Sequence, residues 1–231
     1  YPFLQGGVVH TFIYAFLTSG VKVVLGMFFG VVLISNIKFR NFLRNVVFFP
    51  VLVSTIGVGV TFQELFKPNV GLIAEALKVF GIPPEGLLGN VNTALYAVAA
   101  VDIWKGVGLA TVIFIAGMAA IPQEYYEAAK MDGATPWQRF WGITFPMLMP
   151  TTFFVTTISL ISSFQVFDQV YVMTGGGPAG ATSVMVEQIY KNAFSYFQMG
   201  YASTISWILF ALIFVVTVAQ QLLQKRQDRS N

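Results

Sequence analysis

The residues of this sequence that could do chemistry are polar side chains placed inside long apolar segments. They form two groups with helical spacing, Asp102 with Lys105 and Gln165 with Asp168 and Gln169. Trp104 and Tyr171 stand within these groups and add aromatic planes. Such side chains can bind a polar solute through hydrogen bonds and ring contacts, because ionisable residues in membrane spans are functional candidates by default. A structural alternative stays open, in which Asp102 and Lys105 form an ion pair and the glutamines bond to neighbouring helices.

Catalytic chemistry finds little support in this sequence. There is no Cys and only one His, which excludes a thiol nucleophile and thiolate metal sites. Gly175 and Gly180 have the spacing of a phosphate-binding loop, but Ala181 occupies the position of the required Lys. We therefore predict that the chain is not an enzyme, that it holds no metal or cofactor, and that it does not hydrolyse ATP.

Composition places these polar groups in a membrane protein. Of the 231 residues, 56% are hydrophobic and 10% are charged, whereas a soluble domain has about 25% charged residues. A spanning helix needs about 20 mainly apolar residues, and five stretches qualify: 11–35, 46–66, 94–121, 147–173 and 202–223. The sequence predicts an all-α bundle of five transmembrane helices that forms one domain over residues 1–231. Lys22 falls near the middle of the first span, where it could face a water-filled cavity or pair with another helix.

The distribution of Lys and Arg predicts the orientation. One side of the membrane receives most of the basic loop residues: Lys38, Arg40, Arg44, Lys130, Arg139, Lys225, Arg226 and Arg229. The other side receives Lys67, Lys78 and Lys191. By the positive-inside rule the C-terminus is cytoplasmic and Tyr1 lies outside. A chain that starts outside without a signal peptide predicts one more helix upstream, and so six spans in a complete protein.

The two outer loops, residues 67–93 and 174–201, contain helical patterns of their own. Apolar residues recur with a helical period over 70–80 and again over 182–197. We expect two short helices that lie on the bilayer surface or bind an external partner. The Gly-Gly-Gly-Pro run at 175–178 predicts a flexible outer turn.

The cytoplasmic loop, residues 122–146, predicts two short helices joined by a sharp turn. Pro122 suits the first turn of a helix over 124–131. Gly133 is placed to end that helix in the left-handed region, and Thr135 with Pro136 predicts the start of the second. An ordered loop with small, exposed Ala residues indicates a binding partner in the cytoplasm.

This loop resembles the EAA motif of the membrane subunits of bacterial ABC importers. The motif reads E-A-A-x-x-D-G-A, followed by F, I and P at fixed spacing, and its positions are matched by Glu127, Ala128, Ala129, Asp132, Gly133, Ala134, Phe140, Ile143 and Pro146. The resemblance implies that the loop is a coupling helix seated in a groove of a separate ATPase subunit. It also implies that Glu127 meets a basic residue of the ATPase and that Gly133 makes the turn that presents the helix.

Three further stretches are similar to permeases of carbohydrate importers. They are 162–178, 101–105 and 200–203. The similarity is to the first of the two paired permeases in maltose, multiple-sugar and glycerol-3-phosphate systems, with the type I importer fold. A sugar pathway also fits the polar residues themselves, because hydrogen-bonding groups and aromatic planes suit such a solute; the residues predicted to line it are Gln165, Asp168, Gln169, Tyr171, Asp102 and Trp104.

The resemblance implies a complete import system around this chain. Its expected partners are a second homologous permease, two ABC ATPase subunits that bind ATP and Mg²⁺, an extracytoplasmic solute-binding protein, the carbohydrate and membrane lipid. The expected location is the inner membrane of a bacterium or archaeon, and nucleic acid is not expected to bind. A permease for an amino acid, phosphate or peptide is the nearest alternative, and a gated channel or membrane enzyme is more distant.

Overall fold

The computed structural model describes residues 2–35, 38–67, 70–79, 81 and 86–228. Within these ranges the chain is helical and contains no β-strand, which confirms the expected all-α class. Three helices are long and apolar enough to cross a membrane, and the number rises to five if each of two bent helix pairs is one span. Part of each expected short outer helix is present, while Phe80, at the end of the first, lies outside the described residues.

The chain divides into two compact units, whose boundary falls within α1, α6 and α10. The helices are α1 (Pro2–Ile34), α2 (Arg40–Leu52), α3 (Thr55–Leu65), α4 (Leu72–Lys78), α5 (Gly86–Gly89), α6 (Ala94–Ala119), α7 (Gln123–Met131), α8 (Pro136–Arg139), α9 (Phe145–Met147), α10 (Met149–Phe164), α11 (Asp168–Met173), α12 (Met185–Tyr190) and α13 (Met199–Asp228). Two π-helical turns complete the set, η1 (Phe140–Thr144) and η2 (Lys191–Ser195).

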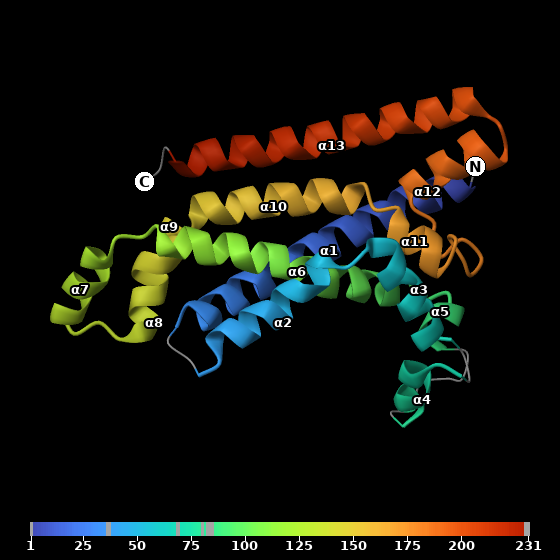
Figure 1. Cartoon of the computed structure of the whole chain (residues 1–231). Helices are drawn as coiled ribbons and strands as arrows, with labels where there is room; N and C mark the ends of the chain where they lie inside the picture. The colour runs from blue at the N-terminus through green and yellow to red at the C-terminus, as the bar shows by residue number, and fades with distance from the viewer. Residues whose placement is uncertain (1, 36–37, 68–69, 80, 82–85, 229–231) are drawn as a thin grey trace. The chain divides into compact units, whose positions relative to one another are not determined.

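The first unit holds residues 1–19, 53–104 and 160–231. Its central core joins α1, α6 and α11 through the fully buried side chains of Tyr14, Val98 and Val170. A second cluster joins α12 to α13 through Met185 and Ile205, and Figure 1 shows α12 beside the first turns of α13. This core holds together the parts of α6 and α11 that carry Asp102 and Gln169.

The second unit holds residues 20–52 and 105–159. Phe114 of α6 and Leu148 are fully buried in its core. Gly26 of α1 lies so close to α6 that a Cβ atom there would come within 2.6 Å of the Ala110 Cβ. The G-x-x-x-G pair Gly26 and Gly30 therefore permits close helix packing, as small residues do at helix interfaces in membranes.

The second and fourth expected spans are not continuous helices. Residues 46–66 are divided between α2 and α3, because Pro50 removes a backbone donor and Ser54 caps the first turn of α3. Residues 147–173 are divided between α10 and α11, with non-helical backbone at Val166 and Phe167. The prediction of a single helix over each of these stretches was wrong, and the second break changes the position of the polar side chains.

Candidate functional site

The loop after α6 folds as two short helices, as its capping residues predict. α7 has no buried side chain, and Glu127 and Ala128 are both exposed. Figure 1 shows α7 and α8 projecting beyond the end of α6. The side chains of Glu127 and Ala128 are therefore available to a partner rather than used in the core of the chain.

Gly133 makes the turn between the two helices. Its φ is +75°, and the amide of Ala134 donates to the Ala129 carbonyl at 2.9 Å while that of Gly133 donates to the Lys130 carbonyl at 3.0 Å. This pair of bonds is the Schellman arrangement at a helix C-terminus. No atom lies within 4 Å of the place where a Cβ would stand on Gly133. The glycine is thus needed for its backbone conformation and not for lack of space.

The turn presents the remaining residues of the motif at its surface. Asp132 is exposed and is the C-terminal cap of α7, while Ala129 and Ala134 are half-buried. Glu127, Ala128, Asp132 and Gly133 are therefore exposed around the turn, while the small side chains of Ala129 and Ala134 are half-buried.

The start of α8 is fixed by a capping box. The amide of Gln138 donates to the Thr135 hydroxyl at 3.3 Å, and the Thr135 amide donates to the Gln138 side-chain oxygen at 2.8 Å. Pro136 occupies the first turn. These reciprocal bonds satisfy two helix-terminal donors and hold the direction in which the chain leaves the Gly133 turn.

Tyr126 connects α7 to the chain that enters α10. Its hydroxyl lies 2.9 Å from the hydroxyl of Thr144 in η1, and its ring contacts the core of the second unit. A hollow of about 380 Å³ beside this bond is also lined by Arg139 and Phe140. The exposed helix α7 is therefore joined by a defined hydrogen bond to η1, the turn that precedes α9 and α10.

The polar groups predicted to line a pathway separate into an internal pair and an exposed set. Asp102 on α6 and Gln169 on α11 are both buried, and the Gln169 amide donates to the Asp102 carboxylate at 3.2 Å. This bond joins two helices of the first unit and satisfies a buried charge in part. The predicted pairing of Asp102 with Lys105 stays a prediction.

Gln165, Asp168 and Tyr171 are exposed. Gln165 follows the last residue of α10, and Asp168 is the first residue of α11, where a negative charge is favoured by the helix dipole. The prediction that Gln169 shares their face was wrong, because the break between α10 and α11 interrupts the helical period. The break separates one glutamine in the interior from two polar side chains at the surface of the unit.

Aromatic rings adjoin the exposed set. The ring of Tyr171 lies 5.1 Å from Phe167 and 5.0 Å from Tyr190, measured between centroids. A hydrogen bond with Tyr171, together with their electrostatic interaction, raises the pKa of Tyr190. Trp104 is half-exposed and its ring lies 5.3 Å from that of Phe62.

Lys22 is buried on α1 in the second unit. Its Cε would lie only 2.7 Å from a Cβ on Gly106 of α6. The absence of a side chain at position 106 therefore leaves the space that the lysine stem occupies.

Residues 22–229 match the family described as binding-protein-dependent transport system inner membrane components. The chain belongs to this family. It is 35% identical over 208 residues to the trehalose/maltose transport system permease protein MalF of Thermococcus litoralis, covering 89% of this chain and 69% of that protein. It is also 35% identical over 205 residues to the multiple sugar-binding transport system permease protein MsmF of Streptococcus mutans, covering 89% of this chain and 70% of that protein.

The fold of this family member agrees with a solved importer. A bacterial ABC transporter involved in the import of the acidic polysaccharide alginate matches with a TM-score of 0.85 at 19% identity, covering 98% of this chain and 80% of that one. The chain is thus a multi-pass inner-membrane permease of all-α fold.

The sequence interpretation missed a buried carboxylate within residues 174–201 of this permease. Glu187 on α12 is fully buried, forms an ion pair with Lys191 and accepts a hydrogen bond of 2.7 Å from Ser183. Lys191 also donates to the carbonyl of Gly175 at 2.8 Å. The Gly-Gly-Gly-Pro run, expected to be a flexible turn, is instead held by hydrogen bonds around this carboxylate. The four-residue spacing of Glu187 and Lys191 was the available signal.

Proposed function

We propose that this chain is the transmembrane permease subunit of an ATP-driven ABC importer for a sugar or related carbohydrate. The observation that carries the proposal is the projecting pair α7 and α8, whose exposed face and fixed turn suit it to docking on another protein. Sugar transport is favoured because the named relatives are permeases of trehalose/maltose and multiple-sugar systems.

The proposed role of the loop is to transmit movement from a partner ATPase. Glu127, Ala128, Ala129, Asp132, Gly133 and Ala134 form the contact segment. The exposed Glu127 carboxylate meets a basic group of the ATPase, and the small Ala side chains allow close approach. ATP and Mg²⁺ are bound by the ATPase subunits, and this chain supplies no catalytic residue.

The proposed solute pathway uses the exposed polar set of the first unit. Gln165 and Asp168 offer hydrogen bonds to sugar hydroxyl groups, and Tyr171 and Trp104 offer aromatic planes to the C–H faces. Asp102 and Gln169 support this wall from inside, since their hydrogen bond joins α6 to α11. The solute crosses by alternating access, in which each state is favoured by its own contacts with the ATPase and the binding protein.

The proposed assembly contains a second permease, two ATPase subunits and an extracytoplasmic solute-binding protein. In the proposed orientation the C-terminus and the α7–α8 loop are cytoplasmic, as the distribution of Lys and Arg indicates. The structure of an alginate importer in complex with a pentasaccharide-bound periplasmic protein provides a precedent of the same fold for such an assembly.

Co-purification tests the proposal. The chain is tagged after Asn231, extracted from membranes in detergent, and the proteins that accompany it are identified and assayed for ATPase activity. We expect an ATPase and a second permease, with ATP hydrolysis stimulated by a sugar-loaded binding protein. Recovery of a homogeneous oligomer without an ATPase would refute the coupling role, and stimulation only by an amino acid or peptide would refute the sugar class.

A further inference from the structure

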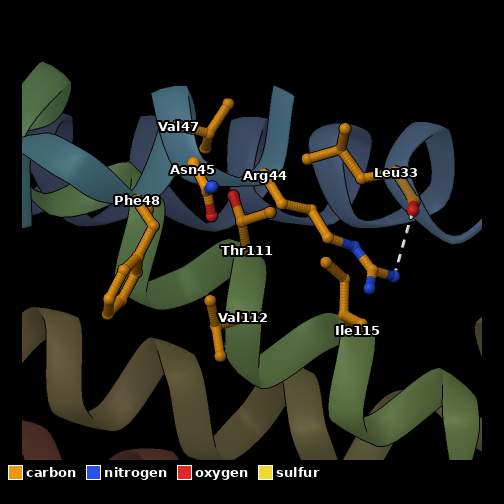
Figure 2. Close-up of a pocket in the computed structure, with 9 residues that line it drawn as sticks. Leu33, Arg44, Asn45, Val47, Phe48, Thr111, Val112 and Ile115 are labelled. Atoms are coloured by element: carbon orange, nitrogen blue, oxygen red, sulfur yellow. Dashed lines mark hydrogen bonds between the residues drawn. The ribbon is translucent and has the colours of Figure 1, made fainter. Parts of the chain in front are cut away.

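A pocket of about 260 Å³ in the second unit has no part in the proposed transport route. It lies among the last turn of α1, the middle of α2 and the second half of α6. Its lining residues are Leu33, Arg44, Asn45, Val47, Phe48, Gly108, Thr111, Val112 and Ile115. Figure 2 shows the guanidinium of Arg44 near Ile115, with the ring of Phe48 on the other side of Asn45 and Thr111. The pocket thus combines one cationic group with a mainly apolar wall.

The hydrogen-bonding capacity of Arg44 is only partly used. One terminal nitrogen donates to the Leu33 carbonyl at 3.1 Å, which satisfies an end carbonyl of α1. The Nε atom is buried and has no hydrogen-bond partner among the described residues. A guanidinium offers five N–H donors in a fixed fork, so this side chain has donors left for an anionic ligand.

None of the described residues that line the pocket carries a carboxylate that could neutralise this cation. No Asp or Glu precedes Glu64 in the sequence, and none of the residues that line the pocket is acidic. Lys38 and Arg40 add two positive charges to the same connection between α1 and α2. The electrostatic environment therefore favours a ligand with negative charge, because bidentate Arg–phosphate contacts are strong and geometrically specific.

The position of the pocket distinguishes a lipid from a soluble anion. Arg44 stands four residues after the start of α2, and so about 6 Å along that helix. In the proposed orientation this depth is the boundary between head groups and hydrocarbon on the cytoplasmic side. The neighbouring side chains of Phe42, Val46 and Phe49 are exposed on α2, as lipid-facing residues are. A ligand at this place would have its charge at Arg44 and its apolar part against Phe48, Val112 and Ile115.

We propose that this pocket binds the head group of an anionic phospholipid of the cytoplasmic leaflet. The phosphate is held by the free donors of Arg44 and by the Asn45 amide, and the first acyl carbons lie against the apolar wall. Basic pockets between transmembrane helices on this side of the membrane are a recognised mode of lipid binding. The leaflet assignment depends on the orientation proposed above, whereas the ligand chemistry depends only on the residues of the pocket.

Native mass spectrometry of the purified protein complex tests the proposal. The complex is titrated with phosphatidylglycerol or, separately, phosphatidylcholine, and bound lipid is counted for wild type, Arg44→Gln and Arg40→Gln. Both variants remove one positive charge from α2, but only the first alters the pocket. We expect wild type and Arg40→Gln to retain phosphatidylglycerol and Arg44→Gln to bind it at least about tenfold more weakly, the effect of one lost charge-assisted contact.

Two further variants separate lipid binding from a purely structural role of Arg44. Arg44→Lys keeps the charge and a donor for Leu33, and we expect it to retain part of the binding. Val112→Trp fills the pocket while leaving Arg44 in place, and we expect it to exclude the lipid. If Arg44→Gln and Arg40→Gln lost phosphatidylglycerol binding equally, the effect would be a general attraction between positive charge and lipid. If wild type bound phosphatidylcholine as well as phosphatidylglycerol, the charge of the lipid would have no role. Either result overturns the proposal, as does displacement of the lipid by equimolar glycerol phosphate, which would indicate a soluble anion site.

Discussion

Substitution of Gly133 tests whether the α7–α8 turn needs the positive φ that glycine permits. Its φ of +75° is rare for residues with a Cβ atom, yet nothing lies within 4 Å of the position that a Cβ would take. Gly133→Ala therefore adds conformational strain without a steric clash. The left-handed conformation costs an L-residue roughly 1–2 kcal/mol, which corresponds to about a 5- to 30-fold shift of the turn toward other conformations.

The expected consequence is a loss of coupling in a protein that still folds. The strain is small against the packing of the membrane helices, and α7 has no buried side chain whose displacement would open the core. We expect Gly133→Ala to reach the membrane at the normal level, to co-purify less ATPase and to transport more slowly. Gly133→Asn should retain more activity than Gly133→Ala, because Asn tolerates the left-handed region better.

Gly142 provides the matched control. It lies nearby in η1, it has no neighbour within 4 Å of a Cβ position, and its φ is not positive. Gly142→Ala should therefore leave co-purified ATPase and uptake unchanged. Gly133→Asp places a second negative charge beside Asp132 on the exposed turn and should abolish transport. Normal uptake by Gly133→Asp at a normal membrane level would refute the assignment of this turn to coupling.

Three other substitutions address the connections of the site. Tyr126→Phe removes the hydrogen bond to Thr144 and should reduce stimulated ATPase activity while the ATPase still co-purifies. In a double-mutant cycle with Thr144→Val, the two losses of activity should not add. Full additivity would show that this bond is not responsible for the loss. Gln169→Leu leaves the buried Asp102 carboxylate without this donor and should lower stability by about 1–3 kcal/mol, measured as a fall in the midpoint of thermal unfolding of the detergent-purified complex; an unchanged midpoint would argue against that support. Asp168→Asn should raise the KM for uptake without altering the amount of ATPase recovered, and an unchanged KM would exclude a solute contact at this position.

Local signals in the sequence account for the parts of the fold that were correctly predicted. Thr135 and Gly133 specify the start of α8 and the end of α7 through contacts within five residues, so both could be predicted from spacing alone. The long apolar runs predicted the α1, α6 and α13 spans for the same reason, since length and hydropathy are properties of the segment itself.

Features that depend on tertiary contacts could not be predicted in this way. Hydropathy does not register the break after Phe164, because apolar residues such as Ile161, Val166 and Val170 recur on both sides of it. The burial of Glu187 depends on how residues 175–183 wrap around α12, which no local pattern specifies. The pairing of Asp102 with Gln169 joins residues 67 positions apart, so helical periodicity on one segment gave no indication of it.

The break between α10 and α11 links these observations to transport. Irregular backbone inside an apolar segment is tolerated where it is buried in protein or lines a water-filled cavity, but not where it faces lipid. Here the break directs Gln169 into the core and leaves Gln165 and Asp168 exposed on the unit. A carboxylate exposed to hydrocarbon is costly, so we expect Asp168, which follows the candidate span that ends at Phe164, to meet water, solute or another subunit. The same irregularity that contradicts the single-helix prediction therefore supports the proposal that this surface belongs to a polar route.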